Sequence, residues 1–412
     1  MTDLINHIVD ISVGELVYGG AAMGRLADGR AVFVSFALPG EVVRARITQE
    51  KRGHALAELV EVIHPSPERI QPRCRHFGAC GGCHYQTLDY PRQLEAKQAI
   101  LRDQLQRIGS IQSPPVTSTV ASPEPWFYRN HVQLHLAPGS QVGYQAPDSH
   151  TVIPIQECFL PEKPLNDLWP LLDLEAIPGL ERVGLRLGAG DNPMIVLEGH
   201  SGEPPELSVD LPVSVVYLDD QGAVVLAGDE ALIMEVRGRL FRVSPGAFFQ
   251  VNSSVAGLMV DYLLAHLPLS PDGVVWDVYC GVGLFSAFLA PRVKHLVGIE
   301  ISPPACQDFA VNLDEFEQVD LYEGAAEAIL PGLPGRPDGV LVDPPRSGLE
   351  KPVIDAILNA MPAWIAYVSC DPATLARDLR RFIQVGYRLE SVTPFDMFPQ
   401  TYHIESISLL RR

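Results

Sequence analysis

A candidate nucleophile stands in the run Ser369-Cys370-Asp371-Pro372-Ala373-Thr374, directly after the apolar segment WIAYV. The apolar segment is typical of a buried strand, and a thiolate at the end of such a strand can attack an electrophilic carbon of a bound substrate. The alternative role is structural, because cysteine is often buried as a small core side chain. The residues around Cys370 must decide between the two roles.

A carboxylate that could serve such a nucleophile follows in His403-Ile404-Glu405, near the start of the last predicted strand. Glu405 is a candidate general base for a substrate bound at Cys370. It could equally be a surface carboxylate. His403 could transfer or orient a proton, although a single histidine more often has a structural role.

Four other cysteines form a second candidate site, with Cys74-x5-Cys80-x2-Cys83 in one segment and Cys158 far downstream. The amino terminus lacks the pattern of a signal peptide, which favours a cytoplasmic protein in which structural disulfides are rare. Metal binding is then the better interpretation. A [4Fe-4S] cluster fits four thiolates, with tetrahedral zinc as the competing metal. The paired x2 spacings of a zinc ribbon are absent, but four cysteines also satisfy zinc, so both a [4Fe-4S] cluster and zinc stay open here for Cys74, Cys80, Cys83 and Cys158.

A third candidate site is a glycine-containing turn, Asp277-Val278-Tyr279-Cys280-Gly281-Val282-Gly283, which follows one predicted strand and opens a helix. Glu300 ends the next strand, where it can accept hydrogen bonds from ribose hydroxyls, and Asp343 ends a third strand before Pro344-Pro345-Arg346. The turn lacks the third glycine of the G-x-G-x-x-G fingerprint, so a nucleotide-binding dehydrogenase or a structural turn also fits it. The rigid Asp-Pro-Pro-Arg run favours a wall for a flat base.

The elements that must position these residues change character along the chain. Short β-rich runs between Gly- and Pro-containing breaks in residues 8–62 predict a small barrel. Residues 63–86 show no periodicity, residues 88–108 have helical spacing, and residues 111–235 hold further short candidate strands. From about residue 250 strands and helices alternate, which predicts a parallel sheet covered on both faces.

This pattern divides the chain into three domains. We expect a barrel at 1–62, a β-rich central domain at 63–240 and an α/β domain at 241–412, with the helix at 88–108 free to pack on the last domain. The net charge of −19 argues against a protein that coats nucleic acid nonspecifically. No apolar run reaches the ~20 residues that span a bilayer, so no membrane association is expected.

Over the whole chain these residues resemble the RNA uracil-5-methyltransferases, in particular the branch that modifies 23S ribosomal RNA (rRNA). Ser369-Cys370-x-Pro372-x-Thr374 and His403-x-Glu405 resemble the nucleophile and base signatures of that family. The four cysteines resemble its cluster ligands, and Phe249-Gln250-Val251-Asn252 resembles the segment whose glutamine contacts S-adenosylmethionine. Residues 8–62, with a Gly-Gly-Ala-Ala-Met-Gly-Arg turn at 19–25, are similar to its RNA-binding TRAM barrel.

The resemblance implies an α/β, Rossmann-like S-adenosylmethionine-dependent methyltransferase domain, an N-terminal OB-like TRAM β-barrel and a β-rich central domain carrying the iron-sulfur cluster. Cys370 would add to carbon 6 of a uridine, and Glu405 would remove the proton from carbon 5 after methyl transfer. The implied cofactor contacts are Gln250, Tyr279, Gly281, Glu300 and Asp343. Leu284 and Ala325 stand where some relatives place asparagines that contact the cofactor, a departure that leaves those contacts to backbone and water.

The expected partner is RNA, with rRNA favoured over transfer RNA (tRNA), and the chain is expected to act as a monomer. The target uridine would be flipped out of its stack toward Cys370. Arg129, Asn130 and Arg346 are candidate phosphate or base contacts, or else surface residues. Two alternatives stay open: a tRNA uridine as target, and a non-catalytic RNA-binding or ribosome-assembly factor in which Cys370 and Glu405 are incidental.

Overall fold

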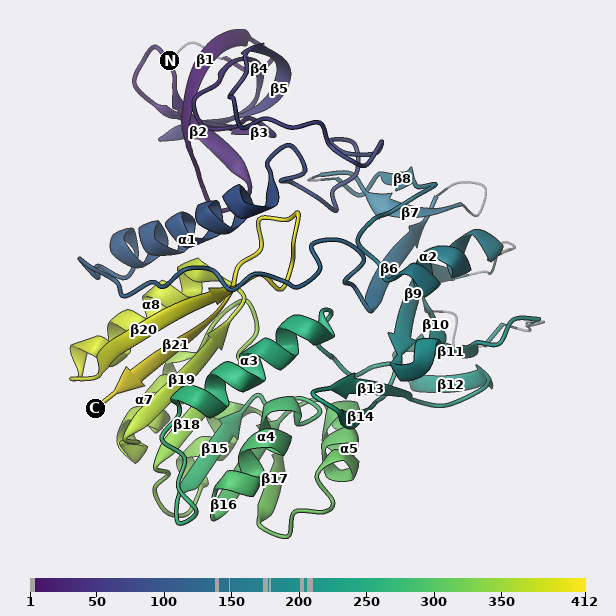
Figure 1. Cartoon of the computed structure of the whole chain (residues 1–412), viewed down its shortest axis with the longest axis vertical. Coiled ribbons are helices and arrows are strands. Elements are labelled where there is room, and N and C mark those ends of the chain that lie inside the picture. The colour runs from purple at the N-terminus through teal and green to yellow at the C-terminus, as the bar shows by residue number, and fades with distance from the viewer. Residues whose placement is uncertain are drawn as a thin grey trace.

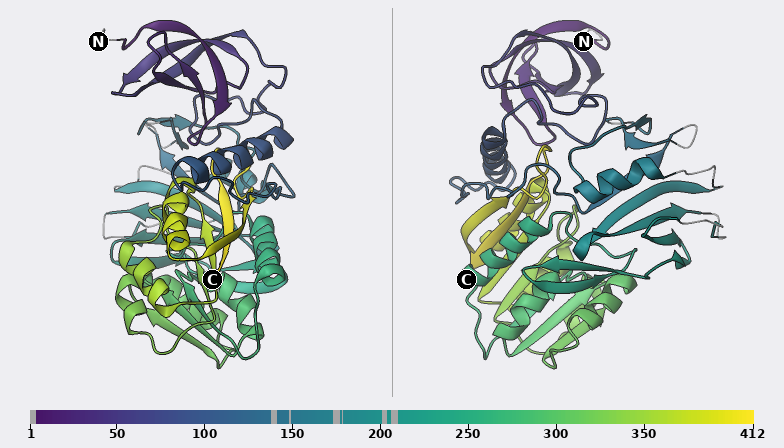
Figure 2. Two further views of the ribbon diagram at one scale, coloured as in Figure 1. Left: turned by 90° about the vertical axis from the view of Figure 1, so that its left-hand side faces the viewer. Right: turned by 45° about the vertical axis from the view of Figure 1, so that its right-hand side comes forward.

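The computed structural model describes residues 4–137, 141–147, 149–172, 177, 179–200, 204–205 and 210–412. Figure 1 shows a barrel at the amino-terminal end, a β-rich region on one side, and an α/β region below them that ends in the strands coloured yellow. The barrel stands on the rest of the molecule in the two further views of Figure 2 as well.

The amino-terminal strands close into a barrel in the order β1-β2-β3-β5-β4, which confirms the barrel prediction. Alternate residues point inward, and Val32, Val34 and Val43 are fully buried. The turn expected at 19–25 is shorter, because only Gly19 and Gly20 take a positive φ and the following residues form β2. The strands are β1 (Ile8–Leu16), β2 (Ala21–Arg25), β3 (Ala31–Ser35), β4 (Val42–Glu50) and β5 (His54–His64).

The central region is a seven-stranded sheet in the order β12-β11-β10-β9-β6-β7-β8, with α2 (Lys163–Leu168) packed against β9. All seven strands lie within residues 111–235, where we predicted short strands, and parts of that range lie outside the described residues. The strands are β6 (His131–Leu136), β7 (Val142–Gln145), β8 (Val152–Pro154), β9 (Leu180–Gly188), β10 (Asn192–Gly199), β11 (Ser214–Asp219) and β12 (Gly222–Ala227). A hairpin of β13 (Leu232–Val236) and β14 (Arg239–Val243), which we did not predict, follows them.

The carboxyl-terminal region is a second seven-stranded sheet in the order β17-β16-β15-β18-β19-β21-β20. Its strands are parallel except β21, which lies antiparallel to both β19 and β20. The strands are β15 (Val274–Val278), β16 (His295–Glu300), β17 (Val319–Glu323), β18 (Gly339–Val342), β19 (Trp364–Ser369), β20 (Arg388–Phe395) and β21 (Glu405–Arg411).

Helices cover both faces of this sheet, as predicted. One hydrophobic core joins a face to α3 (Ser253–His266), α4 (Leu284–Leu289) and α5 (Pro303–Asn312). The other core joins the opposite face to α1 (Tyr90–Arg107), α6 (Ala326–Ile329), α7 (Lys351–Ala360) and α8 (Pro372–Gln384). Only β17 and α6 were missing from the predicted alternation, because β17 is a half-exposed edge strand and α6 is a single short turn.

Helix α1 precedes the central sheet in sequence but packs against α8 and β20 of the α/β region. Figure 1 shows it lying between the barrel and the yellow strands. After α1, residues 116–120 run parallel to β20, where the Val120 amide donates to the Pro394 carbonyl at 2.8 Å. The α/β region is therefore completed by segments that come before the central sheet.

Candidate active site

Cys370 lies between the end of β19 and the start of α8, where local hydrogen bonds fix the backbone. Asp371 caps α8, since its Oδ1 accepts from the amides of Ala373 and Thr374, each at 2.9 Å. The Ser369 hydroxyl accepts from the Asp371 amide at 3.2 Å and donates to the Asp371 carbonyl at 3.1 Å. The cysteine is half-buried rather than enclosed in the core.

The position of Glu405 follows from strand pairing. Strands β19 and β21 are antiparallel, and their last pair is Ser369 opposite Ser406, so Cys370 and Glu405 come directly after that pair on their two segments. The Glu405 carboxyl lies close enough to raise the pKa of the Cys370 thiol. The structure therefore brings together the predicted nucleophile and base, which are far apart in sequence, and buries Glu405 at 4% exposure.

The electrostatics of this pair depend on neighbouring carboxyls and one cation. Burial raises the pKa of the Cys370 thiol to about 12, and the carboxyls of Glu405, Asp343 and Asp371 add to the shift. Burial, with Asp343, also raises the pKa of Glu405 well above its usual value. The Arg346 guanidinium acts in the opposite direction on both groups. In the ligand-free protein the thiol is thus protonated at neutral pH, and Arg346 is the cation that favours its ionisation.

The turn after β15 has the backbone geometry of a ligand-binding loop. Tyr279, Gly281 and Gly283 take positive φ values of 66°, 54° and 88°. A Cβ on Gly283 would lie 2.3 Å from Leu313 Cδ1, so this glycine permits close packing near α5. A Cβ on Gly281 would meet nothing within 4 Å. Gly281 thus borders open space where a ligand can approach the backbone.

Carboxylates gather beside this turn at the carboxyl ends of β15, β16 and β18. Glu300 accepts from the Gly281 amide at 3.0 Å and from the Ser302 amide at 2.8 Å. Asp277 is 1% exposed and accepts from the Ser286 hydroxyl at 2.5 Å, while its Oδ1 has no hydrogen-bond partner. Burial and neighbouring carboxylates raise the pKa values of Asp277 and Asp343 to about 7. A cationic ligand that offers hydroxyl donors, such as S-adenosylmethionine, complements this group of acids.

Gln250 lies in the segment between β14 and α3, which two asparagines hold. The Asn130 amide donates to the Gln250 carbonyl and to the Ser253 hydroxyl, both at 3.0 Å. Asn252 caps α3 by accepting from the Val255 amide at 3.2 Å. Asn130 is 4% exposed with its amide used internally, so the structure does not support the RNA-contact prediction for this residue.

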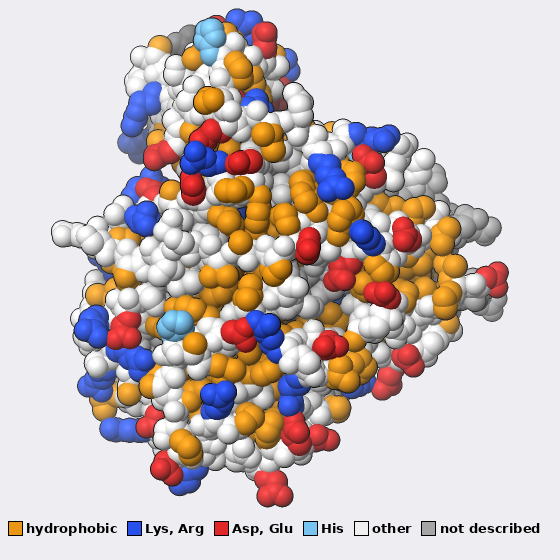
Figure 3. All heavy atoms as spheres, in the orientation of Figure 1, with side chains coloured by type: hydrophobic (Ala, Val, Ile, Leu, Met, Phe, Trp, Pro, Cys, Tyr) orange, Lys and Arg blue, Asp and Glu red, His pale blue; other side chains and the backbone are white. Residues whose placement is uncertain are grey.

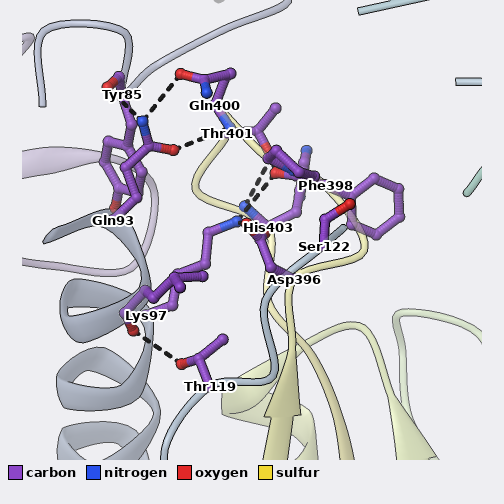
Figure 4. A network of polar contacts seen from close by, with 12 residues as sticks. Tyr85, Gln93, Lys97, Thr119, Ser122, Asp396, Phe398, Gln400, Thr401 and His403 are labelled. Atoms are coloured by element: carbon purple, nitrogen blue, oxygen red, sulfur yellow. Dashed lines mark hydrogen bonds and ion pairs between the residues drawn. The ribbon is translucent and has the colours of Figure 1, made fainter. Parts of the chain in front are cut away.

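The loop of residues 396–404 connects β20 to β21 and leads into Glu405. Helix α1 holds this loop through Lys97, whose Nζ donates to Asp396 Oδ1 at 2.5 Å and to the Phe398 carbonyl at 3.0 Å. Gln93 Nε2 donates to Gln400 Oε1 at 2.9 Å (Figure 4). Lys97 and Asp396 have fully buried side chains, so removing either partner would leave an unpaired buried charge.

His403 lies in the same loop, in an aromatic group with Tyr402 and Phe398. Burial, with the positive charge of Arg346 nearby, lowers the pKa of His403 to about 3. The imidazole is therefore neutral at neutral pH.

The four predicted cluster ligands line one cavity of about 260 Å³, together with Arg129 and His403. The His76 amide donates to Cys74 Sγ and the Gly82 amide donates to Cys80 Sγ, both at 3.4 Å. Burial raises the pKa values of Cys83 and Cys158 to about 12. In the described part of the chain, no group of three or more His, Cys, Asp and Glu side chains is arranged to hold a metal ion. A shared cavity and N–H donors aimed at sulfur nevertheless suit cluster-bound thiolates.

The other residues singled out in the sequence lie in different parts of the site. Arg346 is exposed beside Cys370, whereas the Arg129 guanidinium lies over Tyr128 and Phe398 next to the cysteines. Leu284 is buried at the start of α4.

Two residues near the site were not predicted from the sequence: Tyr18, whose hydroxyl donates to Asp371, and Lys97. A signal for Lys97 existed, since it lies on the apolar face of its helix three residues before Ile100.

Comparisons with known proteins identify the family of this chain. A family model described as tRNA (Uracil-5-)-methyltransferase matches residues 215–329 and 336–412, and a TRAM domain model matches residues 4–60. An uncharacterized RNA methyltransferase of Gloeobacter violaceus is 33% identical over 99% of this chain and 97% of its own length. The chain belongs to the RNA uracil-5-methyltransferase family. Another uncharacterized RNA methyltransferase, from Halalkalibacterium halodurans, is also 33% identical, over 98% of the chain and 97% of the relative.

Among solved structures, the tRNA (uracil-54, C5)-methyltransferase of Pyrococcus abyssi, determined with S-adenosyl-L-homocysteine, has the same fold. Its TM-score is 0.74 with 22% identity, over 98% of this chain and all of that one. The family accounts for the methyltransferase fold with an amino-terminal TRAM barrel, for S-adenosylmethionine as methyl donor and for RNA as the substrate class. Across the face drawn in Figure 3, acidic and basic side chains are interspersed. No helix within the described residues has the length and apolarity needed to cross a membrane.

The carboxylate cluster predicts a pH-dependent stability for the ligand-free protein. Asp277 has a folded pKa of about 7 against an ordinary value of 3.8, so between these values the folded state binds more protons than the unfolded state. The free energy of unfolding should therefore fall as pH rises from about 4 to 7, and Asp277→Asn should reduce this fall by on the order of 3 kcal/mol.

Urea unfolding at a series of pH values measures this effect. The exposed Asp272→Asn is the matched control and should keep the wild-type slope. A wild-type slope in Asp277→Asn as well would contradict the prediction.

Proposed function

We propose that this enzyme methylates carbon 5 of a uridine in 23S rRNA, with Cys370 as covalent nucleophile and Glu405 as general base. The observation that carries the proposal is the β19–β21 pairing, which brings Cys370 and Glu405 to adjoining positions directly after the last pair, Ser369 and Ser406. The thiol is half-buried and the carboxyl of Glu405 is buried close enough to raise the pKa of the thiol.

The chemistry requires both groups. Carbon 5 of uracil is a weak nucleophile, and addition of the Cys370 thiolate to carbon 6 moves an electron pair toward carbon 5 and the carbonyl at carbon 4. S-adenosylmethionine supplies the methyl group that carbon 5 then takes. Glu405 removes the proton from carbon 5, the carbon–carbon double bond re-forms, and the bond between carbon 6 and sulfur breaks. Arg346 favours both ionised side chains.

The residues proposed to bind the cofactor surround the same edge of the sheet. Glu300 would turn toward the ribose hydroxyls, and Gly281 and Tyr279 would present backbone to the ligand. Asp343 and Gln250 would complete the site from the end of β18 and from the segment before α3. The raised pKa values of Asp277 and Asp343 support a cationic ligand, because a positive charge would return these carboxyls toward their ordinary acidity.

The four cysteines favour rRNA over tRNA as substrate. We propose that Cys74, Cys80, Cys83 and Cys158 hold a [4Fe-4S] cluster with a structural or RNA-docking role, since four protein ligands leave no iron open for substrate. Arg129 and His403 line the same cavity, so an RNA that contacts this region would lie close to the loop of residues 396–404.

The substrate proposal is tested with labelled S-adenosylmethionine and total RNA from cells that lack this gene. We expect 5-methyluridine in 23S rRNA, located by digestion and mapping of the labelled nucleotide. Label confined to tRNA would replace the rRNA assignment with the tRNA alternative. Label in a base other than 5-methyluridine would refute the reaction.

The nucleophile is tested with RNA that contains 5-fluorouridine. Fluorine cannot leave as a proton, so the wild-type enzyme should form an adduct that survives denaturation, and Cys370→Ala should form none. Glu405→Gln should accumulate a comparable adduct on unmodified RNA, because proton removal is then blocked. Denaturing electrophoresis measures both. An adduct on Cys370→Ala would remove this residue from the mechanism.

The cluster is tested by metal analysis of protein purified without oxygen. Iron and acid-labile sulfide in equal amounts, with a brown absorbance that Cys83→Ser lowers, are the expected result. Cys306→Ser, a substitution at a thiol outside the cavity, should leave the absorbance unchanged. Zinc in place of iron would overturn the assignment.

A further inference from the structure

The barrel contacts the α/β region next to the nucleophile. The turn between β1 and β2 carries Tyr18, whose hydroxyl donates to Asp371 Oδ2 at 3.0 Å although 353 residues separate the two in sequence. Burial and the Asp371 carboxylate raise the pKa of Tyr18 far above its usual value, so its hydroxyl stays protonated and can donate at any working pH.

The turn packs against the loop of residues 396–404. The Tyr18 ring lies edge-on to Tyr402 with centroids 5.8 Å apart, and Tyr402 in turn contacts His84 and His403. A Cβ added to Gly20 would lie 3.2 Å from both Tyr402 and His84. Because Gly20 also has a φ of 87°, few other residues could stand there, and the barrel turn is held in one position.

Asp371 uses both carboxylate oxygens in this arrangement. Oδ1 caps α8, and Oδ2 accepts from Tyr18. Since Asp371 follows Cys370 directly, the barrel and the helix together fix the residue next to the nucleophile. We propose that Tyr18 is a positioning residue that connects the RNA-binding barrel to Cys370 through Asp371. This inference rests on the proposed role of Cys370.

The hydrogen bond has an electrostatic consequence as well as a geometric one. Glu405, Asp343 and Asp371 face the Cys370 sulfur from β21, β18 and α8, and Arg346 is the opposing cation. A hydroxyl donated to Asp371 offsets part of one of these negative charges. Without Tyr18 the thiol should ionise less readily and the Cys370 backbone should be less well fixed.

The test compares Tyr18→Phe, Asp371→Asn and the double variant. Asparagine preserves the helix cap but removes the charge, so Asp371→Asn should fold normally. The first measurement is the rate at which iodoacetamide alkylates Cys370 in RNA-free protein at a series of pH values, followed on the peptide that contains Cys370. The second is the rate of adduct formation with saturating 5-fluorouridine RNA. Tyr387→Phe, which removes the hydroxyl that donates to Pro362, is the matched control.

We expect Tyr18→Phe to move the alkylation profile to higher pH and to slow adduct formation roughly tenfold, with an unchanged dissociation constant for RNA. Asp371→Asn should move the profile to lower pH, and adding Tyr18→Phe to it should change little. The inference would be overturned if Tyr18→Phe kept both wild-type rates or changed RNA binding alone. It would also be overturned if Tyr18→Phe had the same effect in the wild type and in Asp371→Asn. If the wild type itself forms no adduct, the proposed function fails, whereas the alkylation profile still tests the Tyr18 contact.

Discussion

The chemistry proposed for this enzyme depends on one antiparallel strand pairing. Strand β21 is inserted between β19 and β20 against the direction of the other strands, so its first residue meets the last residues of β19 at the ligand-binding edge. A parallel strand in this place would begin at the opposite edge of the sheet. The reversed strand therefore lets a carboxylate near the end of the chain share a face with Cys370.

The strand pairing can position Glu405 only if the loop that connects β20 to β21 is also held in place. Residues 396–404 are held by α1 through Lys97 and Gln93, and by the cysteine-bearing segment through the amides of His84 and Tyr85, which donate to the Gln400 carbonyl at 2.8 and 3.1 Å. Gln400 itself has a φ of 68°, a backbone conformation that costs energy for a non-glycine residue and persists when the surrounding contacts hold it. The cysteine-bearing segment and the loop of residues 396–404 are thus parts of one hydrogen-bonded unit.

The sequence predicted much of this arrangement, for identifiable reasons. Strands such as VVWDV and WIAYV are buried on both faces and mostly apolar, whereas β17 lies at the edge, has no fully buried residue and gave no such run. The pattern of strand ends put Cys370 and the glycine-containing turn at one edge of the sheet, and the family resemblance added Glu405 as the partner of Cys370. Neither could place Tyr18 or Gln93, because their partners lie more than 300 residues away and no local pattern encodes a contact across that distance. Asn130 was misjudged because a buried amide that supports a loop has the same residue type as an exposed amide that contacts RNA.

The segment of residues 116–120, which runs parallel to β20, limits where the polypeptide can be cut into stable fragments. These residues bond to the outer strand of the α/β sheet, and α1 covers the neighbouring apolar surface. A fragment cut at residue 241 would expose the hydrogen-bonding edge of β20 and the side chains that α1 now shields. Exposed strand edges recruit other chains, so such a fragment would aggregate even though it keeps every strand of the sheet. The region that carries Cys370 and Glu405 is therefore covered by segments that come before the central sheet.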